Sequence, residues 1–120
     1  MLKNVFLALM MVVGTGIYSL AADEITFDSN SMTMMGDPVV LKGNLTKPQG
    51  DGPFPAVVML HPCPGPMPEY EETWVDRFTS WGYVTFRVDS FGPRGESSVC
   101  VKLLAVPPWD RAQDAHDANS

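Results

Sequence analysis

Residues 55–95 constrain the fold of this 120-residue chain more than any other segment. They contain two short apolar runs, at 56–60 and 83–88, which are typical of strands covered on both faces of a parallel sheet. Between the runs, aromatic residues recur at helical spacing, at Tyr70, Trp74, Phe78 and Trp81. Pro68 can begin this helix and Gly82 can end it. The order strand, helix, strand predicts a right-handed crossover with parallel strands, and therefore an α/β fold.

The flanking sequence predicts three more elements. Strands are expected at residues 24–27 and 39–45, separated by a polar turn around Asn30 and Gly36. The second strand alternates on one face, at Val39, Leu41, Gly43 and Leu45. A final helix is expected to begin near Pro107.

Residues 1–21 have the three parts of a secretory signal peptide. Lys3 precedes an apolar run at 5–17, and the small residues Ser19 and Ala21 precede the expected cleavage site. The alternative is an uncleaved anchor, because the run approaches the roughly 18–20 residues that a spanning helix needs. The glycines within the run favour cleavage. We therefore expect a periplasmic or secreted protein without stable membrane association.

The composition fits one small acidic globular domain, residues 22–120. The whole chain is 45% hydrophobic and 18% charged, with a net charge of −6. Cleavage would remove only one charged residue, Lys3, and make the charge −7. A domain this acidic is not expected to bind nucleic acid.

The chain has two cysteines, Cys63 and Cys100. In an exported protein they predict one disulfide. Closing a loop of this length is worth about 4 kcal/mol in the chain-entropy description. The alternative is a pair of unrelated thiols.

The turn at residues 61–65, HPCPG, is the main candidate for chemistry. It directly follows a strand, where acyl-transfer enzymes of this architecture place a backbone N–H that stabilises an oxyanion. Pro62 and Pro64 have no N–H, which leaves Cys63 as the donor. The alternatives are a merely rigid connection and a nucleophile elbow centred on Cys63. An elbow requires a helix to start at once, whereas the prolines here keep the chain extended.

The strand expected at residues 83–88 is followed by DSFGPRG, at residues 89–95. Its glycines permit a tight turn at the carboxyl edge of the sheet, where ligands usually bind. Asp89 is expected to form this turn rather than to act as an acid. Arg94 and His61 are candidate substrate contacts, Arg94 through a substrate carboxylate. The alternative for Arg94 is a solvated loop arginine.

The sequence contains no G-x-S-x-G or G-x-C-x-G elbow. Ser90, Ser97 and Ser98 lack flanking glycines at the required spacing, and His116 falls in the expected last helix. No nucleophile, acid and histidine can therefore be placed.

Methionines offer a different interpretation. Met32, Met34 and Met35, with Met59 and Met67 near His61 and Cys63, could offer soft ligands for a copper ion. Methionine more often fills cores, so no metal or other cofactor is predicted.

Four segments together, PAVVMLHPCPG, SWGY, VTFRVDSFGPRG and SVC, resemble the dienelactone hydrolase family of the α/β-hydrolase fold. The match covers roughly residues 52–118. The resemblance implies the N-terminal half of that fold, an incomplete sheet with two leading strands followed by a βαβ unit. It also implies hydrolysis of a small ester or lactone through an acyl-enzyme formed on a cysteine or serine. By position only Cys63 matches a functional element, the first backbone donor of the oxyanion hole, and Pro62 replaces a glycine common there.

The resemblance therefore implies an exported ester or lactone hydrolase represented by its first half and inactive alone. An alternative of another class is a truncated domain that binds a ligand or partner without turnover. In either case the strand at residues 56–60 would keep an unpaired apolar edge, which promotes aggregation. We accordingly expect residues 22–120 to be poorly stable.

Overall fold

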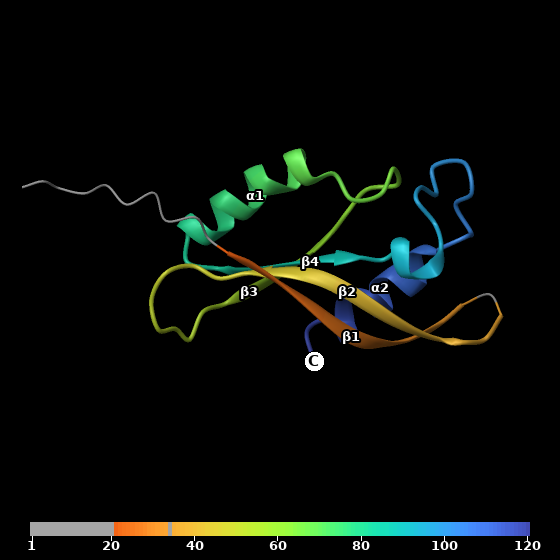
Figure 1. Ribbon diagram of the computed structural model, residues 1–120, viewed down its shortest axis with the longest axis horizontal. Helices are drawn as coiled ribbons and strands as arrows, with labels where there is room; N and C mark the ends of the chain where they lie inside the picture. The colour runs from red at the N-terminus through yellow and green to blue at the C-terminus, as the bar shows by residue number, and fades with distance from the viewer. Residues whose placement is uncertain (1–20, 34) are drawn as a thin grey trace, which may run out of the picture.

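The computed structural model describes residues 21–33 and 35–120. The elements in chain order are β1 (Ala22–Met32), β2 (Pro38–Thr46), β3 (Ala56–Leu60), α1 (Pro68–Ser80), β4 (Val84–Asp89), the 3₁₀ helix η1 (Gly92–Arg94) and α2 (Pro108–Asp117). Four strands form one sheet in the order β1-β2-β4-β3 (Figure 1). Only β3 and β4 are parallel, and the other two pairings are antiparallel. This confirms the α/β class and the predicted parallel pair.

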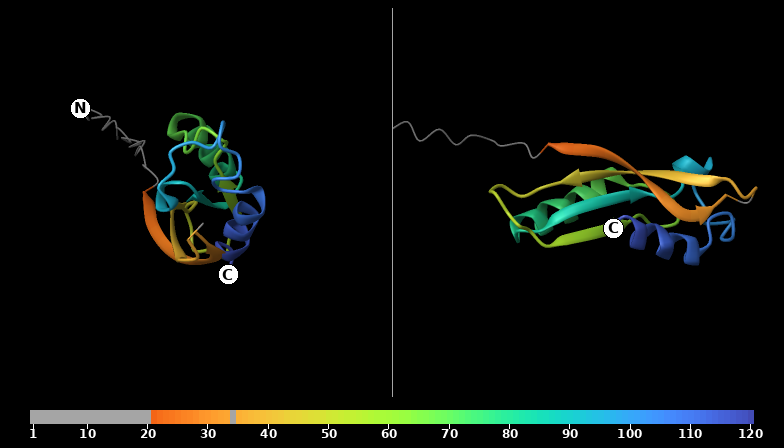
Figure 2. Two further views of the ribbon diagram at one scale, coloured as in Figure 1. Left: turned by 90° about the vertical axis from the view of Figure 1, so that its right-hand side faces the viewer. Right: turned by 90° about the horizontal axis from the view of Figure 1, so that it is seen from below.

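The two helices cover opposite faces of the sheet (Figure 2). On β4, Phe86 packs in a cluster that includes Ala118, at the end of α2. The next residue, Arg87, forms an ion pair with Glu72 of α1. Because side chains alternate between the faces of a strand, α1 and α2 must lie on different sides.

The main core lies between the sheet and α2. Its buried residues are Val39, Leu41, Phe86 and Val88, joined by the partly buried Phe27, Leu45 and Val58. The predicted alternation on β2 is thus confirmed. Gly43 belongs to this face because a Cβ there would lie 2.6 Å from the Phe86 ring. Each fully buried side chain, such as Leu41, stabilises the fold by about 1.5–3 kcal/mol.

Helix α1 begins and ends where the sequence predicts. Pro68 occupies its first turn together with acidic residues, which the helix dipole favours. Glu71 Oε1 accepts a hydrogen bond from the Met67 N–H at 2.9 Å and so satisfies a free donor at the helix start. Gly82, at φ +84°, follows the last turn.

The predicted turn around Asn30 and Gly36 is confirmed at Gly36, which lies between β1 and β2, and is wrong at Asn30. Strand β1 continues to Met32 and β2 begins at Pro38, so Asn30 lies inside β1. The pairing of β1 with β2 has a register shift between Ser29 and Met32, and there the backbone N–H and side chain of Asn30 donate to Asp117 at 2.7 and 2.8 Å. The polar run is therefore part of a strand that pairs with β2 and also contacts a carboxylate of α2.

Strand β3 differs from the expectation that both faces are covered. Ala56 and Leu60 are exposed and the three residues between them are partly buried, whereas β4 is largely buried. Within the described residues β3 pairs with β4 alone. Its outer edge therefore has no strand partner in this part of the chain.

The predicted signal peptide, apart from Ala21, lies outside the described residues. Among those that are described, no helix is long and apolar enough to cross a membrane.

Candidate functional site

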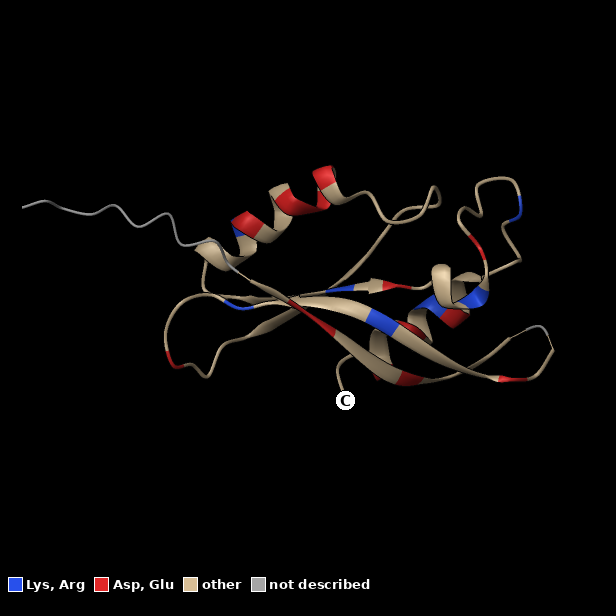
Figure 3. Ribbon diagram, viewed as in Figure 1, with Lys and Arg blue, Asp and Glu red and all other residues tan. Residues whose placement is uncertain are grey.

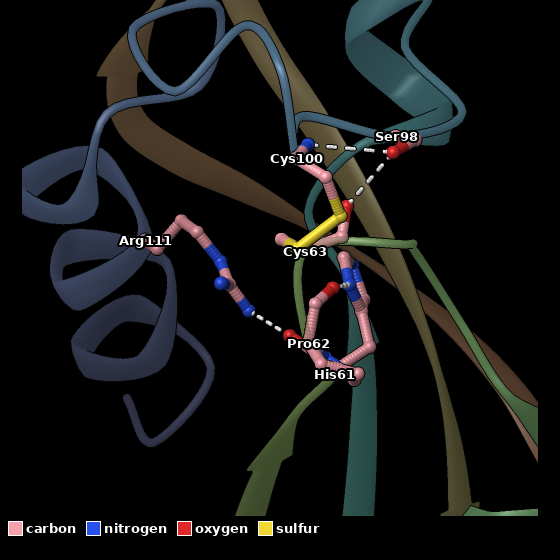
Figure 4. The surroundings of a disulfide bond; sticks show 6 residues. All are labelled: His61, Pro62, Cys63, Ser98, Cys100 and Arg111. Atoms are coloured by element: carbon pink, nitrogen blue, oxygen red, sulfur yellow. Dashed lines mark hydrogen bonds between the residues drawn. A yellow bond between two sulfur atoms is a disulfide. The ribbon is translucent and has the colours of Figure 1, made fainter.

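The carboxyl edge of β3 and β4 brings the predicted site residues together. Because the two strands are parallel, the turn that follows β3 and the turn that follows β4 emerge at the same edge. The loop between η1 and α2 reaches this edge through Cys100 (Figure 4). Three chain segments therefore surround the turn at residues 61–65.

A disulfide joins Cys63 to Cys100, as the sequence predicts (Figure 4). Two hydrogen bonds reinforce the link, because the Cys63 carbonyl accepts from the Val99 N–H at 2.9 Å and from Ser98 Oγ at 3.1 Å. The Cys63 sulfur is therefore not a free thiol nucleophile. The disulfide thus fixes the side chain of Cys63, and the two hydrogen bonds fix its backbone carbonyl.

The Cys63 N–H has no hydrogen-bond acceptor among the described residues. The turn closes instead through the Gly65 N–H, which donates to the Pro62 carbonyl at 3.0 Å. Gly65 has φ +100°, and a Cβ there would lie 2.5 Å from the Ser97 carbonyl oxygen, so only glycine fits. In the described part of the chain, the fixed turn thus contains a backbone N–H, that of Cys63, without a hydrogen-bond partner.

His61 is buried and connects the two turns. Its Nδ1 lies 3.0 Å from the Pro62 carbonyl, and its Nε2 accepts a hydrogen bond from the Ser90 N–H at 3.1 Å. This pattern assigns the neutral imidazole with the proton on Nδ1. The ring lies edge-on to Phe91 with centroids 4.3 Å apart. The His61 side chain is only 1% exposed. A substrate contact by His61 stays a prediction.

Asp89 forms the turn that the sequence predicts. Its Oδ1 accepts from the N–H groups of Phe91 and Gly92 at 3.0 and 2.9 Å. Gly92 is required beside it, because a Cβ would lie 2.5 Å from Asp89 Oδ2.

Arg111, which the sequence analysis did not single out, also supports the site (Figure 4). Its guanidinium donates to the His61 carbonyl and lies 5.2 Å from the centroid of the Phe91 ring. Burial lowers the pKa of Arg111, and the nearby Asp114 carboxylate opposes this effect. Helix α2 thereby holds the backbone of the turn.

Arg94 is not the solvated loop arginine that the sequence allowed. Its two terminal nitrogens donate to the two oxygens of Asp114, both at 2.8 Å. The side chains of Arg94 and Asp114 are 5% and 0% exposed. A carboxylate of the chain thus already occupies the guanidinium. A contact between Arg94 and a substrate carboxylate stays a prediction.

Hydroxyl groups complete this buried ion pair. Ser29 Oγ and Ser31 Oγ donate to Asp114 Oδ1 at 2.9 and 3.3 Å, and Arg94 also donates to the Ser90 carbonyl at 2.6 Å. The only sequence signal was the spacing of Ser29 and Ser31, which places both on one face of a strand.

Asp117 forms a neighbouring cluster. Burial alone would raise the pKa of its carboxyl, but hydrogen bonds from Asn30, Gln113 and His116 outweigh this effect and lower it to about 2. His116 itself is a surface residue, as predicted, with a side chain 76% exposed.

Two groups near the methionines of the alternative copper interpretation are already engaged, and Met34 lies outside the described residues. Cys63 is in the disulfide, and both ring nitrogens of His61 have hydrogen-bond partners. Met32 and Met35 are exposed on the hairpin between β1 and β2. In the described part of the chain, no three His, Cys, Asp or Glu side chains are grouped to hold a metal ion.

No protein-family model, curated protein or solved structure matches this chain.

Proposed function

We propose that residues 22–120 form the oxyanion-binding portion of an exported hydrolase of small carboxylic esters or lactones. The observation that carries the proposal is the Cys63 N–H, which has no acceptor among residues 21–33 and 35–120 and belongs to a disulfide-fixed turn at the carboxyl edge of a parallel strand pair. In this reaction a nucleophile attacks the carbonyl carbon and the carbonyl oxygen becomes negative. A fixed N–H directed at that oxygen stabilises the transition state.

The nucleophile, its histidine and its acid would come from other residues, since residues 1–120 contain no elbow. A single oxyanion donor is worth roughly 10²–10³ in kcat. The N–H of Cys63 therefore has a measurable role only beside a nucleophile. We infer that residues 22–120 alone do not turn over an ester.

Export is part of the same proposal. Disulfides persist in oxidising compartments, so the disulfide between Cys63 and Cys100 supports a location outside the cytoplasm. Sequencing the amino terminus of the protein recovered outside the cytoplasm should give Ala22 as the first residue. Recovery of an intact chain beginning at Met1 from a membrane pellet would contradict it.

The decisive experiment begins with the intact mass of the natural gene product. Its turnover of p-nitrophenyl acetate and of a simple lactone is then measured. A product longer than 120 residues should be active, and two variants separate the donor from the disulfide. Cys63→Ser with Cys100→Ser keeps the N–H, whereas Cys63→Pro with Cys100→Ser removes it.

We expect kcat to fall roughly 10²–10³-fold between these two variants, because they differ in the donor and both lack the disulfide. Equal rates would show that the N–H does not act on the reaction. A natural product that ends at Ser120 and has no turnover would overturn the hydrolase proposal and favour a domain that binds without catalysis.

A further inference from the structure

A groove of about 420 Å³ lies where the hairpin between β1 and β2 meets the loop that precedes α2. The hairpin and the loop are at the same end of the sheet, opposite the connection between β2 and β3 (Figure 1). The described residues that line the groove do not include the turn at residues 61–65. It is therefore separate from the site around Cys63.

Exposed apolar side chains line and flank this groove. The hairpin contributes Met32 and Met35, and the loop contributes Leu104, all three more than half exposed. The same loop also exposes Val101 and Leu103. Single exposed apolar residues are common, but several together on one surface are typical of a place where another molecule binds.

The groove is also acidic. Asp37 of the hairpin, Glu96 of the loop and Asp110 in the first turn of α2 all line it. Figure 3 shows Asp or Glu positions on the hairpin and on the loop that follows η1. Neither Asp37 nor Asp110 takes part in an ion pair formed within the described part of the chain.

The nearby cations do not neutralise these carboxylates. Arg94 lines the groove, but both oxygens of the buried Asp114 accept from its guanidinium, so this pair has no net charge. Lys102 Nζ lies 3.5 Å from Glu96 and its side chain is largely exposed, which makes a weak pair. Three carboxylates against one lysine leave a net charge of −2 at the groove.

This combination restricts the kind of partner that fits. Nucleic acid and anionic membrane surfaces would be repelled by the carboxylates. A wholly apolar partner would cover the carboxylates without compensating their charge, which costs free energy. A partner with apolar side chains and a positive charge satisfies both features. The exposed apolar surface continues from Leu104 to Val101 and Leu103, and a polypeptide segment can cover it.

We propose that this groove docks a basic, apolar segment of a partner protein. Apolar side chains of the segment pack on Met35 and Leu104, and a lysine or arginine side chain lies between Asp37 and Asp110. The aliphatic part of such a side chain can pack on methionine while its charged end contacts the carboxylates. The proposal is independent of the hydrolase proposal, because it involves neither Cys63 nor turnover.

The test measures fluorescence anisotropy of three labelled hexapeptides as the natural gene product is added. The peptides share their leucine and alanine residues and differ only at two positions, which are lysine, glutamine or glutamate. The lysine peptide should saturate and bind at least about fivefold more tightly than the glutamine peptide, as expected for exposed charge pairs. The glutamate peptide should not saturate.

A pair of double variants separates the groove from the overall acidity of the chain. Asp37→Asn with Asp110→Asn should reduce the preference for lysine over glutamine to below about twofold and leave the affinity for the glutamine peptide unchanged. Asp51→Asn with Asp76→Asn removes the same charge at exposed positions outside the groove and should keep the preference.

A second pair of variants tests the apolar contacts. Leu104→Gln should weaken binding of both the lysine and the glutamine peptide at least about fivefold. Tyr70→Gln, a similarly exposed position on α1 outside the groove, should not change either affinity. Circular dichroism confirms that each variant is folded.

Several results would overturn the proposal: no saturable binding of the lysine peptide, equal affinity for lysine and glutamine, or equal loss of preference in the two double variants. Self-association in sedimentation that Leu104→Gln abolishes would assign the surface to a second copy of the chain instead. Binding to neutral lipid vesicles that Leu104→Gln abolishes would assign it to a membrane.

Discussion

The buried pair of Arg94 and Asp114 gives the sharpest stability prediction. Both side chains are almost fully inaccessible, and two hydrogen bonds of 2.8 Å join the guanidinium to the carboxylate. Arg94→Met would leave the Asp114 charge buried with only serine hydroxyls as donors. Breaking a buried pair from one side costs about 3–5 kcal/mol, compared with about 0.2–1 kcal/mol for an exposed pair.

The double variant Arg94→Met with Asp114→Leu removes both charges at once. Replacing a buried pair by apolar groups of similar size is often close to neutral, so the double variant should lose less stability than either single variant. The coupling free energy should reach at least about 3 kcal/mol. For a domain of this size, a single variant would lose a large fraction of a total of about 5–15 kcal/mol.

Urea unfolding monitored by tryptophan fluorescence measures the free energy of unfolding of the parent, the two single variants and the double variant, which together form a double-mutant cycle. A second cycle, on Lys102 and Glu96, is the matched control. That pair is 3.5 Å apart and its lysine is 64% exposed, so its coupling should be below about 1 kcal/mol. Our reasoning about Arg94 and Asp114 fails if the single variants lose less than about 1 kcal/mol, or if the double variant loses the sum of the two.

Three further predictions address the disulfide, acid and the free strand edge. Cys63→Ser should destabilise the chain by about 4 kcal/mol, and addition of reductant should lower the Tm of the parent but not of the variant. The pKa of Asp117 in the folded chain is about 2, below its ordinary 3.8. Ionised Asp117 therefore stabilises the folded state above about pH 4, and this stabilisation is lost as the pH falls through 2. Asp117→Asn should make the urea midpoint less dependent on pH in this range. Ala56→Lys, on the outer strand, should reduce concentration-dependent light scattering, whereas Ala112→Lys, the same change on an exposed helix position, should not.

The sequence analysis predicted what local patterns encode. The helix that begins at Pro68 and the alternating face of β2 follow from side-chain periodicity, which is visible over ten residues. The role of Asp89 as a turn former follows from its place between a strand and two glycines. The disulfide was predictable because the chain offers a single pair of cysteines.

The sequence analysis was wrong where a distant segment changes the role of a residue. Asn30 has the composition of a turn, yet it lies within a strand that pairs with β2, and its N–H donates to Asp117, 87 positions later. Strand β3 has the composition of a buried strand, yet its burial depends on which elements lie beside it. Arg94 resembles a solvated residue until Asp114 is brought to it.

The sequence by itself therefore determined the α/β class, the parallel pair of strands and the Cys63 turn as the candidate oxyanion donor. Only the tertiary structure decided that His61 is buried, that Arg94 pairs with Asp114 and that an apolar groove with acidic residues lies between the β1–β2 hairpin and the loop before α2. The physical reason is that periodicity and capping act within one turn or strand, whereas burial and charge pairing depend on contacts such as that from Ser29 to Asp114, 85 positions apart. Local sequence patterns therefore determine the helices and strands, whereas their packing determines which polar groups are left without a partner.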